Sequence, residues 1–201
     1  MRSVLLSDIG NVLLHVDREK SLRPLSEKLS CAPEKLVPYL IEHPVHRDLE
    51  LGTISGQEFI NRMLEALDSE ANLSVAELTS IMGESFSLNQ ELIDGIEGYR
   101  SGVEVILLSN TNAIDIPAIE DRFGLISWAD AAVLSYTIQR RKPSPAIYRY
   151  VIDDHHLIPE QTLFIDDLPE NIRAAREFGI RAEVYESPEQ VRALLDELTE
   201  E

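Results

Sequence analysis

Short apolar runs separated by helix-forming segments are the feature of this sequence that most constrains its fold. Continuous apolar runs, rather than runs alternating with polar residues, are typical of parallel strands covered on both faces. The runs are residues 3–7, 103–108, 162–165 and 180–185, with a weaker fifth at 131–134. Helical patterns lie between or after them at residues 89–99, 144–153, 169–178 and 187–197. Alternating strands and helices predict an α/β fold with a doubly wound parallel sheet.

The stretch from residue 18 to residue 87 interrupts this alternation. It holds four helix-period segments without a convincing strand: residues 19–29, 33–42, 55–67 and 74–86. We interpret it as a helical domain, 18–87, inserted into an α/β core domain formed by 1–17 and 88–201. An insertion after the first strand lies over the carboxyl ends of the strands, where ligands bind in open α/β sheets. The alternative is that these helices pack elsewhere on the sheet.

Composition and charge exclude several classes of partner. The net charge of −18 disfavours nucleic acid and anionic membrane surfaces, because both require clustered Lys and Arg. No apolar run is long enough to span a bilayer, and the apolar start of the chain carries Asp8 and lacks a small-residue cleavage site. Cys31 has no second cysteine to pair with, which fits a reducing compartment. We expect a cytoplasmic monomer or homodimer that binds neither nucleic acid nor membrane.

Polar residues follow the apolar runs, closely in three cases. Because the carboxyl ends of parallel strands lie at one edge of a sheet, these residues should converge there. Taken singly, each could be an ordinary turn or helix-cap residue. Their coincidence in one chain favours a functional site. The residues are Asp8, Ser109, Asn110, Lys142, Asp166 and Asp167.

These residue types are suited to phosphoryl transfer. A carboxylate such as Asp8 can attack phosphorus to give an aspartyl-phosphate, which divides one difficult hydrolysis into two easier steps. Two anions approach each other only with a cation, and Mg²⁺ binds carboxylates together with substrate phosphate. The 166–167 pair adds carboxylates, and Lys142 can neutralise charge on the transferring oxygens. The Ser109 hydroxyl and nearby backbone N–H groups can hold a phosphate oxygen.

The order and strand context of these residues resemble the haloacid dehalogenase (HAD) superfamily. The segments VLLSDIGNVL, LLSNTN, RKPSPAIY and FIDDLPENI look like its motifs one to four, and the insertion lies where that superfamily has a type-one helical cap. The sequences of these segments are most similar to those of bacterial α-glucose-1-phosphate phosphatases and of the phosphatase half of soluble epoxide hydrolase. The cap phrase DLELGTISGQEF also resembles the former.

The resemblance implies a Rossmann-like core with a helical cap and a magnesium-dependent phosphatase of small phosphorylated metabolites. Its mechanism would be phosphoaspartyl, with Asp8 as nucleophile and metal ligand. The Gly10 carbonyl and the Asp167 carboxylate would be further metal ligands. Asp166 would either support these direct ligands from behind or reach the ion through a water molecule. All four positions match the superfamily's motifs one and four.

The resemblance also assigns the phosphate side of the site. Ser109 and Lys142 would hold the phosphoryl group. Asn110 and Asn171 match positions that line the site in relatives. In the cap, Arg47 could contact a substrate anion, although a surface salt bridge is an equally good interpretation.

Gly10 is a departure from the usual pattern, which has a second Asp there as general acid for the leaving group. A positioned general acid contributes ~10²–10⁴-fold to the rate. A better leaving group, as in a sugar 1-phosphate, would reduce the need for one. Another group could also serve, and the candidates are Asp17, His15, His43 and His46. The remaining alternative is a catalytically weak or inactive HAD-like protein with a binding or regulatory role.

Two other functions fit the residues less well. Dehalogenation attacks carbon without magnesium, and an acidic pair would repel a carboxylate substrate. A phosphoacceptor signalling domain has its acidic pair after the first strand and its acceptor after the third. Here Asp8 comes first and the pair last, so the chain order excludes a receiver domain.

Overall fold

A parallel five-stranded sheet forms the centre of the protein. The computed structural model describes residues 2–41 and 43–200. In the order β5-β4-β1-β6-β7, the strands are β5 (Ala131–Leu134), β4 (Val103–Ser109), β1 (Ser3–Ser7), β6 (Thr162–Asp166) and β7 (Arg181–Val184). Every neighbouring pair is parallel, and Leu5 of β1 lies opposite both Val105 and Leu163. The predicted sheet is confirmed, including the weak fifth strand.

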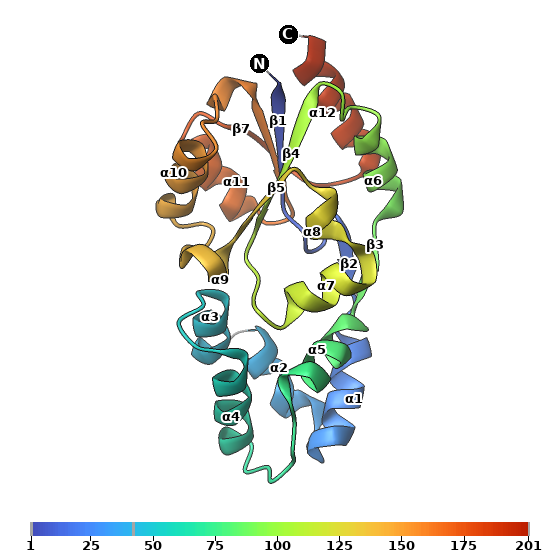
Figure 1. Cartoon of the computed structure of the whole chain (residues 1–201), viewed down its shortest axis with the longest axis vertical. Coiled ribbons are helices and arrows are strands. Elements are labelled where there is room, and N and C mark those ends of the chain that lie inside the picture. Colours follow the sequence, from blue (N-terminus) through green and yellow to red (C-terminus); the bar gives the residue numbers. More distant parts are fainter. Residues whose placement is uncertain (1, 42, 201) are drawn as a thin grey trace.

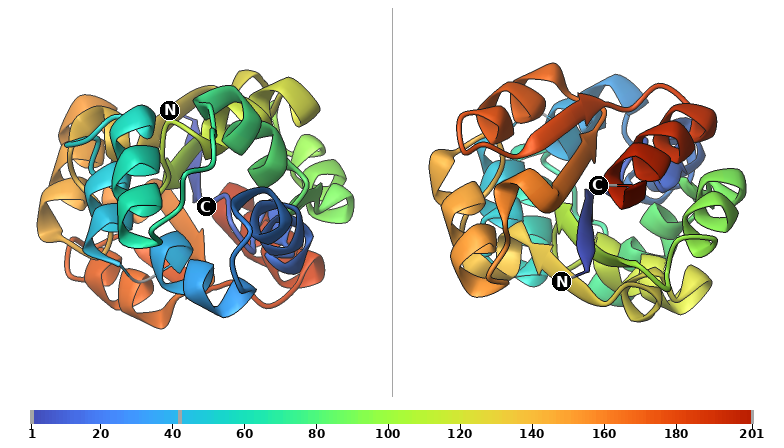
Figure 2. Two further views of the ribbon diagram at one scale, coloured as in Figure 1. Left: turned by 90° about the horizontal axis from the view of Figure 1, so that it is seen from below. Right: turned by 90° about the horizontal axis from the view of Figure 1, so that it is seen from above.

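Helices cover both faces of this sheet (Figures 1 and 2). Because neighbouring strand residues point to opposite faces, Leu5 and Leu6 belong to two different hydrophobic clusters. The view from above in Figure 2 shows a pair of helices on each side of the strands. On one side lie α10 (Pro145–Asp154) and α11 (Pro169–Arg176), and on the other α6 (Gln90–Glu97) and α12 (Pro188–Glu200).

The described part of the stretch predicted as helical contains five helices rather than four. The unpredicted one is α3, which is only one to two turns long and begins at a proline. The apolar faces of all five helices pack on one another in a separate cluster that includes Leu25, Phe59 and Ile60. The helices are α1 (Glu19–Leu29), α2 (Pro33–Ile41), α3 (Pro44–Glu50), α4 (Gly56–Ala66) and α5 (Val75–Gly83). Glu42, the predicted end of the second segment, lies outside the described residues. The division into two domains stays a prediction.

A short antiparallel ribbon joins these helices to the sheet. It pairs β2 (Leu14–Val16) with β3 (Phe86–Leu88), so that the chain leaves and re-enters the core through adjacent strands. The Asp17 N–H donates to the Ser85 carbonyl at 2.8 Å and prolongs the ribbon. The prediction that residues 18–87 contain no strand, and that a helix reaches residue 86, was therefore wrong. A strand of three residues carries too little alternation to be recognised.

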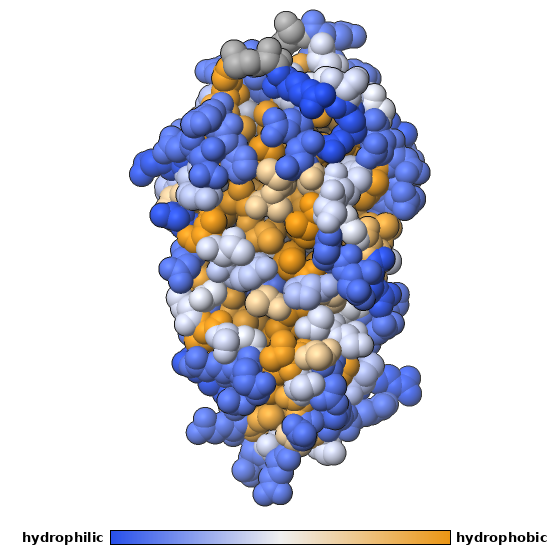
Figure 3. All heavy atoms as spheres, viewed as in Figure 1, coloured by the Kyte–Doolittle hydropathy of each residue, from blue (hydrophilic) through white to orange (hydrophobic). Residues whose placement is uncertain are grey.

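Three helices between β4 and α10 had no predicted counterpart. They are α7 (Asp115–Phe123), α8 (Leu125–Trp128) and α9 (Ser135–Ile138), and a 3-10 turn, η1, spans Pro159–Gln161. On the face seen in Figure 1, apolar side chains gather in a band along the long axis, with hydrophilic ones around them (Figure 3). Across residues 2–41 and 43–200, every helix is too short or too polar to traverse a lipid bilayer.

Candidate active site

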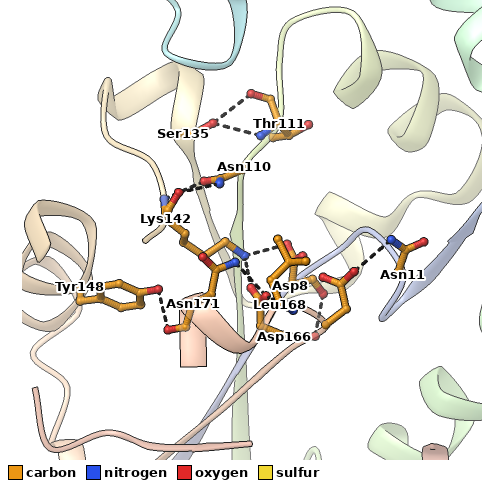
Figure 4. A network of polar contacts seen from close by, with 12 residues as sticks. Asp8, Asn11, Asn110, Thr111, Ser135, Lys142, Tyr148, Asp166, Leu168 and Asn171 are labelled. Atoms are coloured by element: carbon orange, nitrogen blue, oxygen red, sulfur yellow. Dashed lines mark hydrogen bonds and ion pairs between the residues drawn. The ribbon is translucent and has the colours of Figure 1, made fainter. Parts of the chain in front are cut away.

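The polar residues that follow the strands meet at the carboxyl edge of the sheet (Figure 4). β1 lies between β4 and β6, so Asp8 lies between the ends of those two strands. Its N–H donates to the Ile165 carbonyl at 3.0 Å, which continues the sheet by one residue. Ser109 is the last residue of β4, and Asp166 is the last residue of β6. The convergence expected from the sequence is present.

Lys142 bridges two of the carboxylates. Its Nζ lies 2.9 Å from Oδ1 of Asp8 and 2.6 Å from Oδ2 of Asp166. The lysine side chain is 1% exposed, and its Nζ is 5.5 Å from the centre of the Phe164 ring. A buried charge without a partner is costly. The two carboxylates and the ammonium group therefore hold one another in place, with a net charge of −1 from the three groups.

Three acidic residues form a group that could hold a cation. Asp8, Asp166 and Asp167 each offer a carboxylate oxygen, and these atoms lie within 4.8 Å of one another. Asp167 is half-buried, and its Oδ2 accepts a hydrogen bond from Nδ2 of Asn11 at 3.0 Å. Asn11 has a φ of 56°, a left-handed conformation that Asn tolerates better than most residues. Hard oxygen donors at this spacing fit Mg²⁺.

The pKa values of these groups respond to burial and to mutual charge. Burial raises the pKa of Asp8 from 3.8 to about 6, although Lys142 acts in the opposite direction. Burial also raises the pKa of Asp167. Burial alone would lower the pKa of Lys142, but the charges of Asp8 and Asp166 outweigh it and raise the pKa. The negative charge of the carboxylates thus exceeds the positive charge of Lys142, and a metal ion would reduce this excess.

Asp166 is fixed by hydrogen bonds through both of its oxygens. Oδ1 accepts from the Leu168 N–H at 2.9 Å and from Nδ2 of Asn171 at 2.8 Å, while Oδ2 accepts from Lys142. Asn171 is in turn held by the Tyr148 hydroxyl, which donates to its carbonyl at 2.9 Å. Asp166 and Asn171 therefore form a buried support beneath the site.

Asn110 fixes the backbone of Lys142. Its Nδ2 donates to the Lys142 carbonyl at 2.9 Å, and its Oδ1 accepts from the Lys142 N–H at 2.8 Å. The side-chain amide that was expected to hold phosphate is thus engaged in positioning the lysine, and its contact with substrate stays a prediction. Ser109 is buried and makes no comparable side-chain bond among those described, so its hydroxyl remains suited to the predicted phosphate contact.

A cavity of ≈100 Å³ lies between the carboxyl edge of the sheet and the inserted helices. Gly10 and Ser109 line it from the core, next to the acidic group. Asp115 of α7 also lines it from the core, and the polar lining from the insertion includes Arg18, His46, Glu50 and Ser85. This cavity joins the predicted phosphate end of the site to the helical insertion, so it is the natural place for a leaving group.

The candidate general acids and Arg47 differ in whether they line this cavity and in whether their side chains are already hydrogen-bonded. His46 lines the cavity, but burial, followed by the charges of two arginines, lowers its pKa to about 4 and leaves it neutral at physiological pH. Asp17 is half-exposed and its Oδ1 accepts from a backbone N–H at the start of α1. His43 uses Nδ1 to cap α3. His15 and Arg47 are exposed, and neither lines this cavity.

Sequence reasoning missed several residues that shape the site. Asn11, which holds Asp167, lies in the segment that resembles motif one, and Glu50, which lines the cavity, lies in the cap segment DLELGTISGQEF, but the sequence assigned neither residue a role. Ser135 was also missed: its Oγ accepts from the Thr111 N–H at 3.0 Å (Figure 4). The same Oγ donates to the Glu50 carbonyl at 2.6 Å. Contacts between residues this far apart in the chain leave no local pattern.

Comparison with known proteins gives consistent matches over most of the chain. The model of the haloacid dehalogenase-like hydrolases matches residues 41–179. A curated relative, the D-ribitol-5-phosphate phosphatase of Bacteroides thetaiotaomicron, is 30% identical over 179 residues, which is 86% of each chain.

Solved structures agree with this assignment. A HAD family enzyme from Bacteroides thetaiotaomicron, crystallised with magnesium and inorganic phosphate, has a TM-score of 0.79 and 26% identity, covering 92% of this chain and 95% of that one. A HAD-like family hydrolase from Porphyromonas gingivalis has a TM-score of 0.80 and 28% identity, covering 96% of this chain and 98% of that one.

Proposed function

Since the chain belongs to the haloacid dehalogenase-like hydrolases, we propose that it is a magnesium-dependent phosphatase of small sugar or polyol phosphates. The observation that carries the proposal is the contact of Lys142 with both Asp8 and Asp166, beside Asp167. The phosphatase named for ribitol 5-phosphate supports a polyol ester. Gly10 supports a sugar 1-phosphate, because the anomeric oxygen is a better leaving group and depends less on an acid.

Asp8 acts as the nucleophile in this proposal. Its Oδ1 is held by Lys142, which leaves Oδ2 to attack phosphorus. A bond forms between Oδ2 and phosphorus, the bond to the leaving oxygen breaks, and that oxygen takes up a proton. Water then hydrolyses the aspartyl-phosphate and releases phosphate. Lys142 orients the carboxylate and stabilises charge on the transferring oxygens.

The carboxylates present fit a magnesium ion. Asp8, Asp167 and the Gly10 carbonyl would hold the ion, and Asp166 would reach it through water, since both Asp166 oxygens already accept hydrogen bonds. When bound, the ion supplies the positive charge that lets a phosphate dianion approach a carboxylate. Asn11 contributes by holding Asp167 in place.

Magnesium should raise the melting temperature more at about pH 7.5 than at about pH 5. The pKa of Asp8 is raised to about 6, so its protonated form favours the folded protein at low pH, and that contribution is lost as pH rises through about 6. Protons therefore compete with the ion below that pH. Thermal unfolding across pH, with and without magnesium, measures the effect. Asp167→Asn should abolish the shift, and an equal shift at both pH values would contradict the argument.

Gly10→Asp should raise activity on alkyl phosphates relative to p-nitrophenyl phosphate by about tenfold or more. A Cβ at this position would meet only Val16 Cγ2 at 3.9 Å, so the new side chain has room. An acid there can protonate a poor leaving group, which p-nitrophenolate does not need. The matched control is Gly10→Asn, which has the same shape without an acidic proton. Equal ratios for the Asp and Asn variants would show that position 10 does not reach the leaving oxygen.

A magnesium-supplemented panel of phosphate monoesters tests the function itself. It should contain p-nitrophenyl phosphate, a sugar 1-phosphate, a polyol phosphate and a nucleoside monophosphate. We expect many turnovers on the first three and loss of activity with a chelator. A protein that hydrolyses none of these esters would instead support the alternative, a weak or inactive protein with a binding or regulatory role.

A further inference from the structure

The last residue of α3, Glu50, and the turn that follows it are in direct contact with the core. Ser135 Oγ donates to the Glu50 carbonyl at 2.6 Å, and Arg141 Nη2 lies 2.9 Å from Glu50 Oε2. A Cβ on Gly52 would lie 2.1 Å from the Tyr136 carbonyl oxygen, so the two backbones are in direct contact. Both the backbone and the carboxylate of Glu50 are therefore held by the core, which gives this residue of the insertion a defined place over the site.

Glu50 lines the same cavity as Gly10 and Ser109, and Asp115 lines it as well. Each of the two acidic residues keeps an oxygen that is available to a ligand. Oε2 of Glu50 is taken by Arg141, and Oδ2 of Asp115 accepts from Asn112, whereas the other oxygens have no hydrogen bond among the described contacts. Oε1 of Glu50 is 3.9 Å from the His46 ring. These oxygens accept hydrogen bonds from hydroxyl groups. Arg141 neutralises the charge of Glu50, and Arg18 also lines the cavity, so the carboxylates act here as hydrogen-bond acceptors and not as a net negative charge.

Ser85 supplies an independent sign of a polar ligand. It is 2% exposed and lines the cavity, yet its Oγ has no hydrogen-bond partner among the described residues. Buried hydroxyl groups in folded proteins are nearly always hydrogen-bonded. A substrate hydroxyl in the cavity would provide the partner. The hydroxyl of Ser85 can both donate and accept, which matches an alcohol better than it matches a purely anionic group.

The size of the cavity limits what can enter. At ≈100 Å³ it is well below the ~300–1,000 Å³ of typical small-molecule pockets. Phe86 and His46 supply rings to the lining, but the volume is too small for a nucleobase together with its ribose. A compact aliphatic group fits better than a nucleoside.

We propose that Glu50, together with Ser85 and Asp115, selects esters whose leaving group is a small uncharged polyhydroxy compound. The carboxylates and the serine hydroxyl would bond to its hydroxyl groups, whereas an ionised carboxylate or phosphate on the leaving group would have no proton to donate to the acidic oxygens. This inference rests on the proposed phosphatase function and assigns its specificity to named residues.

The test compares two four-carbon esters that differ in one group, erythritol 4-phosphate and 4-phosphoerythronate. The wild type should prefer the neutral ester in kcat/KM by about tenfold or more. Glu50→Gln removes one negative charge and keeps the shape, so it should reduce this preference by about tenfold. Glu65→Gln, an exposed position on α4, is the matched control and should keep the wild-type preference.

Ser85→Ala provides a second variant that does not disturb the ion pair with Arg141. It should raise KM for erythritol 4-phosphate by about fivefold or more, with a smaller effect on p-nitrophenyl phosphate. Its melting temperature should not fall, because the hydroxyl has no protein partner to lose.

Three results would overturn the inference. One is a wild type that hydrolyses p-nitrophenyl phosphate but treats the two four-carbon esters alike, which leaves the phosphatase function intact. Another is a Glu50→Gln variant that loses the same factor on all three substrates, which would mean that Glu50 only supports the core through Arg141. A wild type inactive on every ester would remove the phosphatase function, and the selectivity with it.

Discussion

Replacing Asp8 with Asn should lower kcat on p-nitrophenyl phosphate by at least about 10⁴-fold. The amide has nearly the same shape as the carboxylate, but it is a poor nucleophile and cannot form the aspartyl-phosphate. The effect should be the same on every phosphate ester, since all share the first step. Steady-state kinetics with magnesium in excess measure it.

The Asn variant should remain folded. Burial already makes the ionised Asp8 unfavourable, as its raised pKa indicates, and Lys142 keeps its contact with Asp166. Its melting temperature without magnesium should therefore equal or exceed that of the wild type. Asp121→Asn, the same change at an exposed position on α7, is the control and should keep activity. A folded Asp8→Asn protein with more than about 1% of wild-type kcat would rule out Asp8 as nucleophile.

Lys142→Met should damage both activity and stability. Loss of the ammonium group removes a stabilising charge from the transferring phosphoryl group, and we expect kcat to fall by about 10²–10³-fold. It also leaves Asp8 and Asp166 buried without their shared cation. Removing one partner of a buried ion pair typically costs about 3–5 kcal/mol, so the free energy of unfolding should fall by about 3 kcal/mol at about pH 7.5.

The pH dependence separates this electrostatic cost from lost packing. Without the lysine, the pKa of Asp8, which burial already raises to about 6, rises further. Asp8 is therefore protonated at about pH 5, and the destabilisation should shrink there. Denaturant unfolding at both pH values measures the difference. Lys35→Met, an exposed position on α2, should change stability by no more than about 0.5 kcal/mol. An equal loss at both pH values would indicate a packing defect instead.

The sheet and the polar cluster at its edge were predictable from the sequence for one shared reason. The three central strands β1, β4 and β6 are buried almost throughout and are therefore largely apolar runs, and parallel strands place the residues that follow them at one edge. That rule alone brings Asp8, Ser109, Asp166 and Asp167 together. Lys142 was harder, because it lies beyond α9 rather than directly after a strand.

The contacts from the insertion were not predictable in the same way. α3 and β3 are too short to show a period, so the position of Glu50 over the site had no local signal. The four candidate acids could not be ranked, because exposure of Asp17 and capping by His43 depend on where the β2–β3 ribbon and α3 begin. Asn110 was recognised as a site residue, but its hydrogen bonds to the Lys142 backbone depend on a loop conformation.

The β2–β3 ribbon gives this architecture a modular character. Val16 and Phe86 lie opposite each other, so the helical insertion occupies the place where a simple hairpin would have its turn. The residues proposed for phosphoryl transfer lie on the sheet side of that junction, while Glu50 and Ser85, which we propose to contact the leaving group, come from the insertion. Replacement of the inserted helices during evolution would therefore change the ester that is accepted and leave the residues proposed for phosphoryl transfer unaltered.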